Sequence, residues 1–203
     1  MFSPFSVFSI GFSGSRSLSR ASCAALCDLL PLVPPRCRVS VGCADGVDRL
    51  VRDFFSSPPS LLVFSVASGR FGSGRSAFAR RSVACIRSVA AGDRGLLAAL
   101  PSSPVCPAGV FPARRFFGGG SGSWGSAAFA LGSGRRVLLW LPGSSAPPVW
   151  AGVDWERWQA CWWLGFPFPP GSVISFLVLL YYARLFPPGI CLIIPCYYAI
   201  IKA

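Results

Sequence analysis

The sequence predicts an α/β fold in which a parallel sheet of about five strands carries helices on both faces. The first observation is that short apolar runs alternate with stretches of helical pattern, joined by turns rich in Gly and Ser. The second is composition, because 53% of the 203 residues are apolar and only 13% are charged, against roughly a quarter in an average domain. Such a chain is too apolar to be a disordered tail and is long enough to bury a core.

Five apolar runs are the expected strands, and helical stretches connect them. The strands are expected at residues 5–12, 38–41, 61–66, 96–100 and 136–141. The helices are expected at residues 17–30, from the second turn to about residue 55, at 76–90 and at 124–131. Ser17 or Ser19 can cap the first helix by accepting an N–H hydrogen bond, and Pro31 prevents the helix from continuing.

The composition divides the chain into three parts. Residues 1–145 form the expected domain, whereas residues 146–171 are rich in Pro and Trp without clear periodicity and are expected to be an irregular linker. Residues 172–203 are an apolar tail, whose two apolar runs are each shorter than the roughly 20 residues of a membrane-spanning helix. A kinked membrane span or re-entrant hairpin, a tail packed on the domain, a disordered tail and a readthrough or frameshift extension are the alternatives.

Charge and the metal-binding residue types restrict the chemistry. The chain has 19 basic and 7 acidic residues, a net charge of +12, no His, and nine Cys without a C-x-x-C pair. The absence of His excludes His-dependent triads and Cys/His zinc sites, and we expect no metal site. The positive charge favours an anionic partner, which is a nucleotide phosphate, nucleic acid or an acidic membrane surface.

The N-terminus lacks the charged region of a secretory signal, so we expect a cytoplasmic protein, with membrane association through the tail as the alternative.

The turn after the first expected strand is the first candidate ligand site. In an open parallel sheet, ligands bind beyond the carboxyl ends of the strands. Gly14 allows close backbone approach, Ser15 lies in the turn before the helix, and Arg16 can pair with a phosphate through two hydrogen bonds. A plain strand-to-helix turn is the alternative.

The turn after the second strand, within VSVGCADGVDRLV, is the second candidate. Gly42 and Gly46 keep this turn free of bulky side chains, and Asp45 can cap the following helix. Asp48 can accept a hydrogen bond from a ribose hydroxyl or pair with Arg52 at the i, i+4 spacing.

A glycine-rich loop before the last helix is the third candidate. Gly120, Ser121, Gly122 and Ser123 open a helix of small residues that begins near Trp124. Bare backbone at a helix N-terminus can hold a phosphate through its N–H groups and the helix dipole. A flexible linker is the alternative.

Arg70, in the glycine-rich segment after the third strand, either contacts an anionic ligand at the same edge or stays solvated.

Together, GSRS after the first strand, GCADGVD after the second and GGGSGSW before the last helix resemble the SLOG superfamily of Rossmann-like nucleotide-binding domains, which includes DprA-like and LOG (cytokinin-activating phosphoribohydrolase) branches. The pattern is most similar to the YspA/YpsA-related group, with a GSR-type first turn and a GGA-x-G-x-D-type second turn. The resemblance covers residues 5–142 and does not include the tail.

The resemblance implies a nucleotide or nucleotide-derived ligand, held by the first turn and the final glycine-rich loop. It assigns ligand contacts to residues of all three turns: Gly14, Ser15, Arg16, Gly42, Asp45, Gly46, Asp48, Gly120, Gly122, Ser123 and Trp124. We therefore expect a sensor or accessory module that binds such a ligand.

Two alternatives also follow from the resemblance. In the hydrolytic branch a Glu ends the PGGxGTxxE loop, but Ser126 stands at that position, and the helix Arg of the branch corresponds to Arg75, Arg80 or Arg81. A phosphoribohydrolase is therefore the first alternative, with Asp45 or Asp48 replacing the Glu. A DprA-like single-strand binder, in which Trp124 stacks on bases, is the second.

Overall fold

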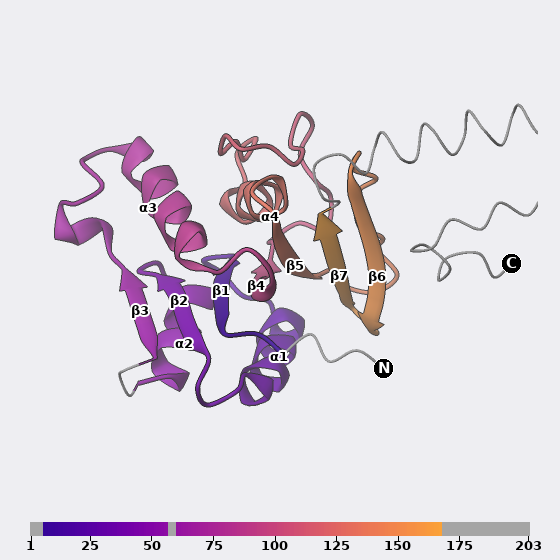
Figure 1. The fold of residues 1–203 in the computed structure, drawn as a ribbon, viewed down its shortest axis with the longest axis horizontal. Coiled ribbons are helices and arrows are strands. Elements are labelled where there is room, and N and C mark those ends of the chain that lie inside the picture. The colour runs from indigo at the N-terminus through magenta and orange to yellow at the C-terminus, as the bar shows by residue number, and fades with distance from the viewer. Residues whose placement is uncertain (1–5, 57–59, 168–203) are drawn as a thin grey trace, which may run out of the picture. The chain divides into compact units, whose positions relative to one another are not determined.

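The computed structural model describes residues 6–56 and 60–167, in which seven strands form one sheet (Figure 1). The strand order is β3-β2-β1-β4-β5-β7-β6. The strands are Ser9–Gly14 (β1), Arg38–Gly42 (β2), Leu61–Phe64 (β3), Gly92–Leu100 (β4), Arg135–Trp140 (β5), Val153–Gln159 (β6) and Trp162–Pro167 (β7). Strands β1 to β5 are parallel to one another, whereas β7 is antiparallel to both β5 and β6. The expected α/β class is confirmed, with two strands more than the five expected.

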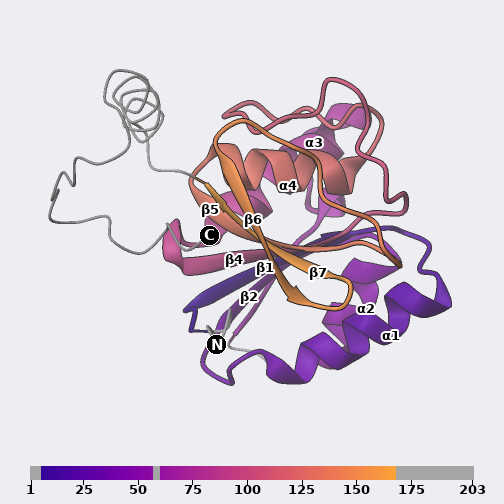
Figure 2. The same ribbon diagram turned by 90° about the vertical axis from the view of Figure 1, so that its right-hand side faces the viewer.

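Four α-helices of the described residues cover the two faces of the sheet. They are Arg20–Leu29 (α1), Val47–Phe54 (α2), Arg75–Ser88 (α3) and Gly122–Gly132 (α4). Figure 2 shows α1 and α2 on one face and α3 and α4 on the other. Short 3₁₀ turns follow α1 at Leu30–Leu32 and β3 at Val66–Ser68. The parallel strand order 3-2-1-4-5, with helices on both sides, is that of a Rossmann-like fold.

Local sequence explains where the first helix begins. Ser19 is the N-cap of α1, because its side chain accepts a hydrogen bond of 3.1 Å from the N–H of Ser22. This agrees with the second of the two expected caps. The Pro at position 31 falls in the 3₁₀ turn that ends the helix, where an α-helical N–H bond is no longer needed.

The core lies in two layers because β4 is central and buried on both faces. Leu96, Ala98 and Leu100 pack under α1 and α2, and the alternate residues Leu97 and Ala99 pack under α3 and α4. All five are fully buried. Successive strand side chains point to opposite faces, so a continuous apolar run supplies both layers.

The stretch predicted to be an irregular linker instead contains the β6–β7 hairpin. Trp140 of β5 pairs with Trp162, and β6 pairs with the far side of β7. Trp155 lies opposite Gly165, where a Cβ would come within 2.6 Å of the indole ring. The linker prediction was wrong because it relied on the Pro and Gly content of this stretch. The same stretch contains several Trp residues, which favour strands, and their pairing across the two strands stabilises the hairpin.

Because of the hairpin, the domain extends further along the chain than expected. The first compact unit of the chain is Met1–Phe168, rather than the expected 1–145. Before the hairpin, the buried Trp150 donates a hydrogen bond of 3.0 Å from its indole N–H to the Val110 carbonyl. The apolar tail expected at 172–203 lies outside the described residues. Among the helices of the described part, none is long and apolar enough to cross a membrane.

Candidate functional site

The strand order brings the three candidate turns to one edge of the sheet. Strands β1, β2 and β4 are parallel, so the turn after β1, the turn after β2 and the loop from β4 to α4 all leave from their carboxyl ends. The order reverses between β1 and β4, because β2 lies on one side of β1 and β4 on the other. Such a switch point is where Rossmann-like folds place ligands.

The turn after β1 is held by its neighbours. The Ser15 N–H donates to the Leu100 carbonyl at the end of β4, and the Ser15 hydroxyl donates to the Ser17 carbonyl at 2.6 Å. Arg16 is exposed, and its guanidinium carbon lies 5.0 Å from the centre of the Phe78 ring on α3. Hydrogen bonds therefore fix the path of the first turn, and its cation lies beside α3.

The turn after β2 packs directly on the turn after β1. Gly46 has a φ of 69°, and a Cβ there would overlap the Ser15 carbonyl oxygen and the Arg16 backbone. The N–H of Val47 donates to the same Ser15 carbonyl at 3.1 Å. Gly46 is thus required by contact between the two turns, rather than by the approach of a ligand.

Asp45 does not act as the helix cap that was predicted. The N-cap of α2 is Gly46, which has no side-chain cap, and Asp45 is exposed. Gly46 occupies the cap position because only a positive φ lets the chain turn against Ser15.

Asp48 forms a buried ion pair that the sequence analysis did not identify. Its Oδ2 lies 2.8 Å from Nη1 of Arg81 on α3 and accepts a hydrogen bond of 3.1 Å from the Ala44 N–H. Burial raises the pKa of the Asp48 carboxyl, and Arg81 and the Ala44 N–H offset this only in part. The ion pair with Arg52, one of the two alternatives for Asp48, does not form, because the Arg52 guanidinium donates to the carbonyls of Gly42 and Ala44 instead.

The ion pair also fills the space beside Gly42. A Cβ at Gly42 would overlap Nη1 of Arg81 and lie against the Asp48 carboxylate. The absence of a side chain at Gly42 therefore admits the Asp48–Arg81 pair and leaves no room there for a phosphate. Asp48 is likewise committed to Arg81 and is not free to hold a ribose hydroxyl.

The glycine-rich loop has the exposed backbone that the third candidate requires. Ser121 is the N-cap of α4, and its side chain accepts a hydrogen bond from the Trp124 N–H. Gly120 has a φ of 88°, and both Gly120 and Gly122 are exposed. A Cβ at Gly122 would meet no atom within 4 Å. The first N–H groups of a helix have no partner within the helix, so those of Gly122 and Ser123 point out of its N-terminus.

A hydrogen bond joins this helix to the end of β1. The Ser13 hydroxyl donates to the Ser126 hydroxyl at 2.9 Å, and Ser126 is buried. Residue 126, where the hydrolytic branch has its Glu, is thus a structural contact between β1 and α4. Ser13 was not among the expected site residues. The sequence signal for the close approach of β1 and α4 at this point is the small size of the Ser13 and Ser126 side chains.

Trp124 does not have the exposed ring that base stacking needs. It is 1% exposed, and its indole N–H donates to the Ser103 carbonyl at 3.0 Å. Its ring lies edge-on to that of Trp150, with the ring centres 6.1 Å apart, and Trp150 in turn lies 6.0 Å from Trp155. The indole belongs to the core because Trp150, three residues before the hairpin begins, packs against it. Ser123 is also buried, so both residues can offer a ligand only their backbone.

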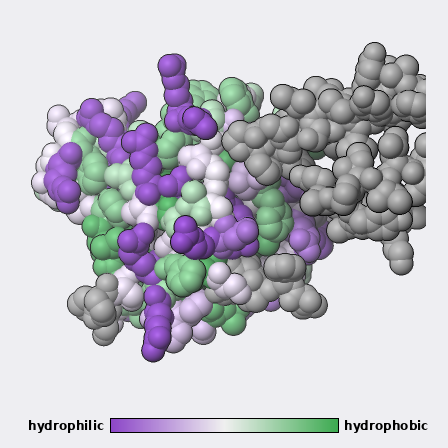
Figure 3. Space-filling view, viewed as in Figure 1, coloured by the Kyte–Doolittle hydropathy of each residue, from purple (hydrophilic) through white to green (hydrophobic). Residues whose placement is uncertain are grey.

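The arginines at this edge are exposed. On the face of the molecule drawn in Figure 3, hydrophilic side chains are scattered among apolar ones. Arg70 follows the 3₁₀ turn at Val66–Ser68, and Arg75 begins α3. Arg75 precedes Phe78 by three residues, about one helical turn, so it is on the same side of α3 as the ring that Arg16 contacts. Of the three candidates for the helix Arg of the hydrolytic branch, Arg81 is the one paired with a carboxylate, and its guanidinium is buried.

The cysteines of the described part are free thiols, and no cluster of potential metal ligands forms among those residues. Burial raises the pKa of the Cys37 thiol to about 11 and that of the Cys85 thiol to about 12. Thiols that are buried and protonated behave as small apolar side chains.

The fold and this edge define an α/β protein with a Rossmann-like sheet and a glycine-rich helix N-terminus at its switch point. No protein-family model matches the chain, and no curated protein or solved structure is significantly similar to it.

Proposed function

We propose that the chain binds a nucleotide or nucleotide-derived ligand at the switch point between β1 and β4, as a sensor or accessory module of the SLOG type. The observation that carries the proposal is the open backbone at Gly122, placed beside the end of β1 by the Ser13–Ser126 hydrogen bond. The N–H groups and dipole of α4 favour a phosphate there. Arg16 and Arg75 add positive charge on the α3 side of the same edge.

Binding is favoured over hydrolysis by the surroundings of the carboxylates. Asp48 is buried against Arg81, and Ser126 replaces the Glu of the hydrolytic branch. A general acid or base must reach the proton that it transfers. In the described part of this edge, Asp45 is the exposed carboxylate that could do so, and it lies after β2 rather than at the glycine-rich loop.

The test is a thermal-shift screen of the full chain with AMP, ATP, GTP, NAD, ADP-ribose and cyclic dinucleotides. A ligand present at 100 times its dissociation constant stabilises the folded state by about 2.7 kcal/mol. We expect Gly122→Val to abolish the shift, because its side chain would occupy the space in front of the α4 N–H groups. Gly122→Ala should weaken it less.

Ser133→Ala is the matched control, since Ser133 lies at the opposite end of α4, where its hydroxyl donates to the Phe129 and Ala130 carbonyls. It should lower the melting temperature and retain the ligand shift. Unchanged affinity in a folded Gly122→Val protein, or no shift with any of these nucleotides, would contradict the proposal.

A further inference from the structure

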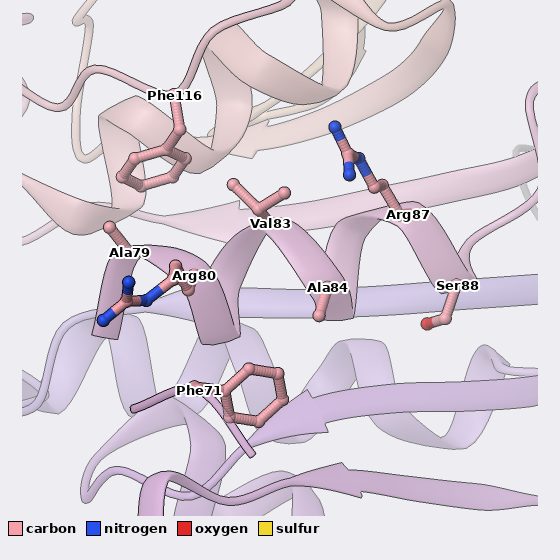
Figure 4. Close-up of a pocket in the computed structure, with 8 residues that line it drawn as sticks. All are labelled: Phe71, Ala79, Arg80, Val83, Ala84, Arg87, Ser88 and Phe116. Atoms are coloured by element: carbon pink, nitrogen blue, oxygen red, sulfur yellow. The ribbon is translucent and has the colours of Figure 1, made fainter. Parts of the chain in front are cut away.

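An open depression of about 720 Å³ runs along α3, apart from the switch point (Figure 4). Phe116, from the loop before α4, and Phe71, from the loop before α3, lie on the two sides of the helix. Between them the surface is formed by small apolar side chains, among them Ala79 and Val83. The depression therefore has an apolar floor with aromatic walls.

Two arginines of α3 border this floor. Arg80 and Arg87 are seven residues apart, which is two helical turns or about 10 Å along the axis. Arg80 donates to the Ser76 hydroxyl at 2.9 Å, and within residues 6–56 and 60–167 neither arginine has a carboxylate partner.

The border carries an excess of positive charge. The pKa of Arg135 is lowered first by burial and then by the neighbouring Arg87 cation. Among the residues that the structure describes, none of those lining the depression is acidic. The uncompensated charge favours a partner that brings carboxylates to the two ends of the floor.

We propose that this depression docks an amphipathic helix of a partner protein, with two carboxylates about two turns apart and apolar side chains between them. A helix places residues i and i+7 on one face at the spacing of Arg80 and Arg87, and residues i+3 and i+4 over the floor. Small side chains at Ala79 and Ala84 allow close approach of the two helix axes. An apolar centre with arginine and aromatic side chains is typical of protein interfaces.

A nucleic acid fits this surface less well. Single-stranded binding sites combine aromatic rings with a groove that remains positively charged along the backbone. Here the floor between Arg80 and Arg87 is made of apolar side chains, including Val83, which cannot replace the water around a phosphodiester.

The test uses the full chain and a fluorescein-labelled, Ala-based helical peptide of about 18 residues. The peptide has Glu at two positions seven apart and Leu at the third and fourth positions after the first Glu. A second peptide has Lys in place of both Glu residues. Fluorescence anisotropy should show that the acidic peptide binds about tenfold more tightly than the Lys peptide.

Arg80→Glu/Arg87→Glu should weaken binding of the acidic peptide about tenfold and strengthen binding of the Lys peptide. Arg20→Glu is the control, because Arg20 is exposed on α1 at the opposite face of the sheet. If the charge reversal prevents folding, Arg80→Gln/Arg87→Gln replaces it. This neutral variant should bind the acidic peptide more weakly than the native protein, with a smaller loss of affinity than the charge reversal would cause.

Several outcomes would overturn the proposal: no binding of the acidic peptide, equal binding by the charge-reversed variant, or tighter binding of oligothymidylate through the same two arginines. The last would assign the surface to nucleic acid. The nucleotide-induced thermal shift should be the same in the charge-reversed variant, so failure here is distinct from failure of the nucleotide-binding proposal.

Discussion

Asp48 of α2 and Arg81 of α3 form an ion pair of 2.8 Å although their helices cover opposite faces of the sheet. The two side chains meet beyond the carboxyl end of β2, in the space that Gly42 leaves empty. Both are almost fully buried, so the pair connects the two layers of the domain where β2 ends.

Arg81→Met should destabilise the domain by about 3–5 kcal/mol, because it leaves the Asp48 carboxylate buried without its partner. Urea denaturation followed by circular dichroism measures this loss. The exposed pair Arg49–Asp53 is the control, and Arg49→Ala should cost less than about 1 kcal/mol. Equal losses for the two variants would contradict the structural role of the buried pair.

The pH dependence of stability should change in Asp48→Asn. Burial raises the folded-state pKa of Asp48 above its ordinary value of 3.8. Between these two pKa values the folded state binds more protons than the unfolded state, so the contribution of Asp48 to stability is lost as pH rises. The free energy of unfolding is measured by urea denaturation at a series of pH values for both proteins. The value for the native protein minus that for Asp48→Asn should fall as pH rises above 3.8. A flat or rising difference would refute this assignment.

Gly42→Ala should destabilise the protein by about 1–3 kcal/mol, since the added Cβ would overlap the Arg81 guanidinium. The cost should be smaller when Arg81→Ala is already present, which a double-mutant cycle measures. Gly122→Ala is the control, because its Cβ meets no protein atom. Additive losses in the cycle would show that Gly42 and Arg81 are not coupled.

The hairpin should be required for folding. A chain cut after residue 168 retains every strand of the described part, whereas a cut after Pro148 removes β6, β7 and Trp150. The shorter chain would uncover the Trp124 ring and the edge of β5, so we expect a lower melting temperature or aggregation. Circular dichroism melting and size-exclusion chromatography compare the two chains. Identical melting of both would restore the linker interpretation of residues 146–171.

The parallel half of the fold could be predicted because its signals are local. Each of the strands β1 to β5 overlaps an expected apolar run, and each of the first four is followed by a loop containing Gly or Ser that leads into a helix. The cap at Ser19 and the glycine-rich start of α4 are likewise set by residues within a few positions of each other. Periodicity and capping act over short stretches of chain, so the sequence by itself determines them.

The remaining features depend on which distant segments meet. Trp124 is predicted to be a ligand contact at the end of a glycine-rich loop, and it is buried because Trp150, 26 residues further along the chain, packs against the ring. Asp48 has Arg52 four residues away, yet it pairs with Arg81, 33 residues further along the chain. Whether a polar side chain faces solvent, a ligand or a buried partner is set by desolvation and by the packing of elements around it, and those exist only in the folded molecule.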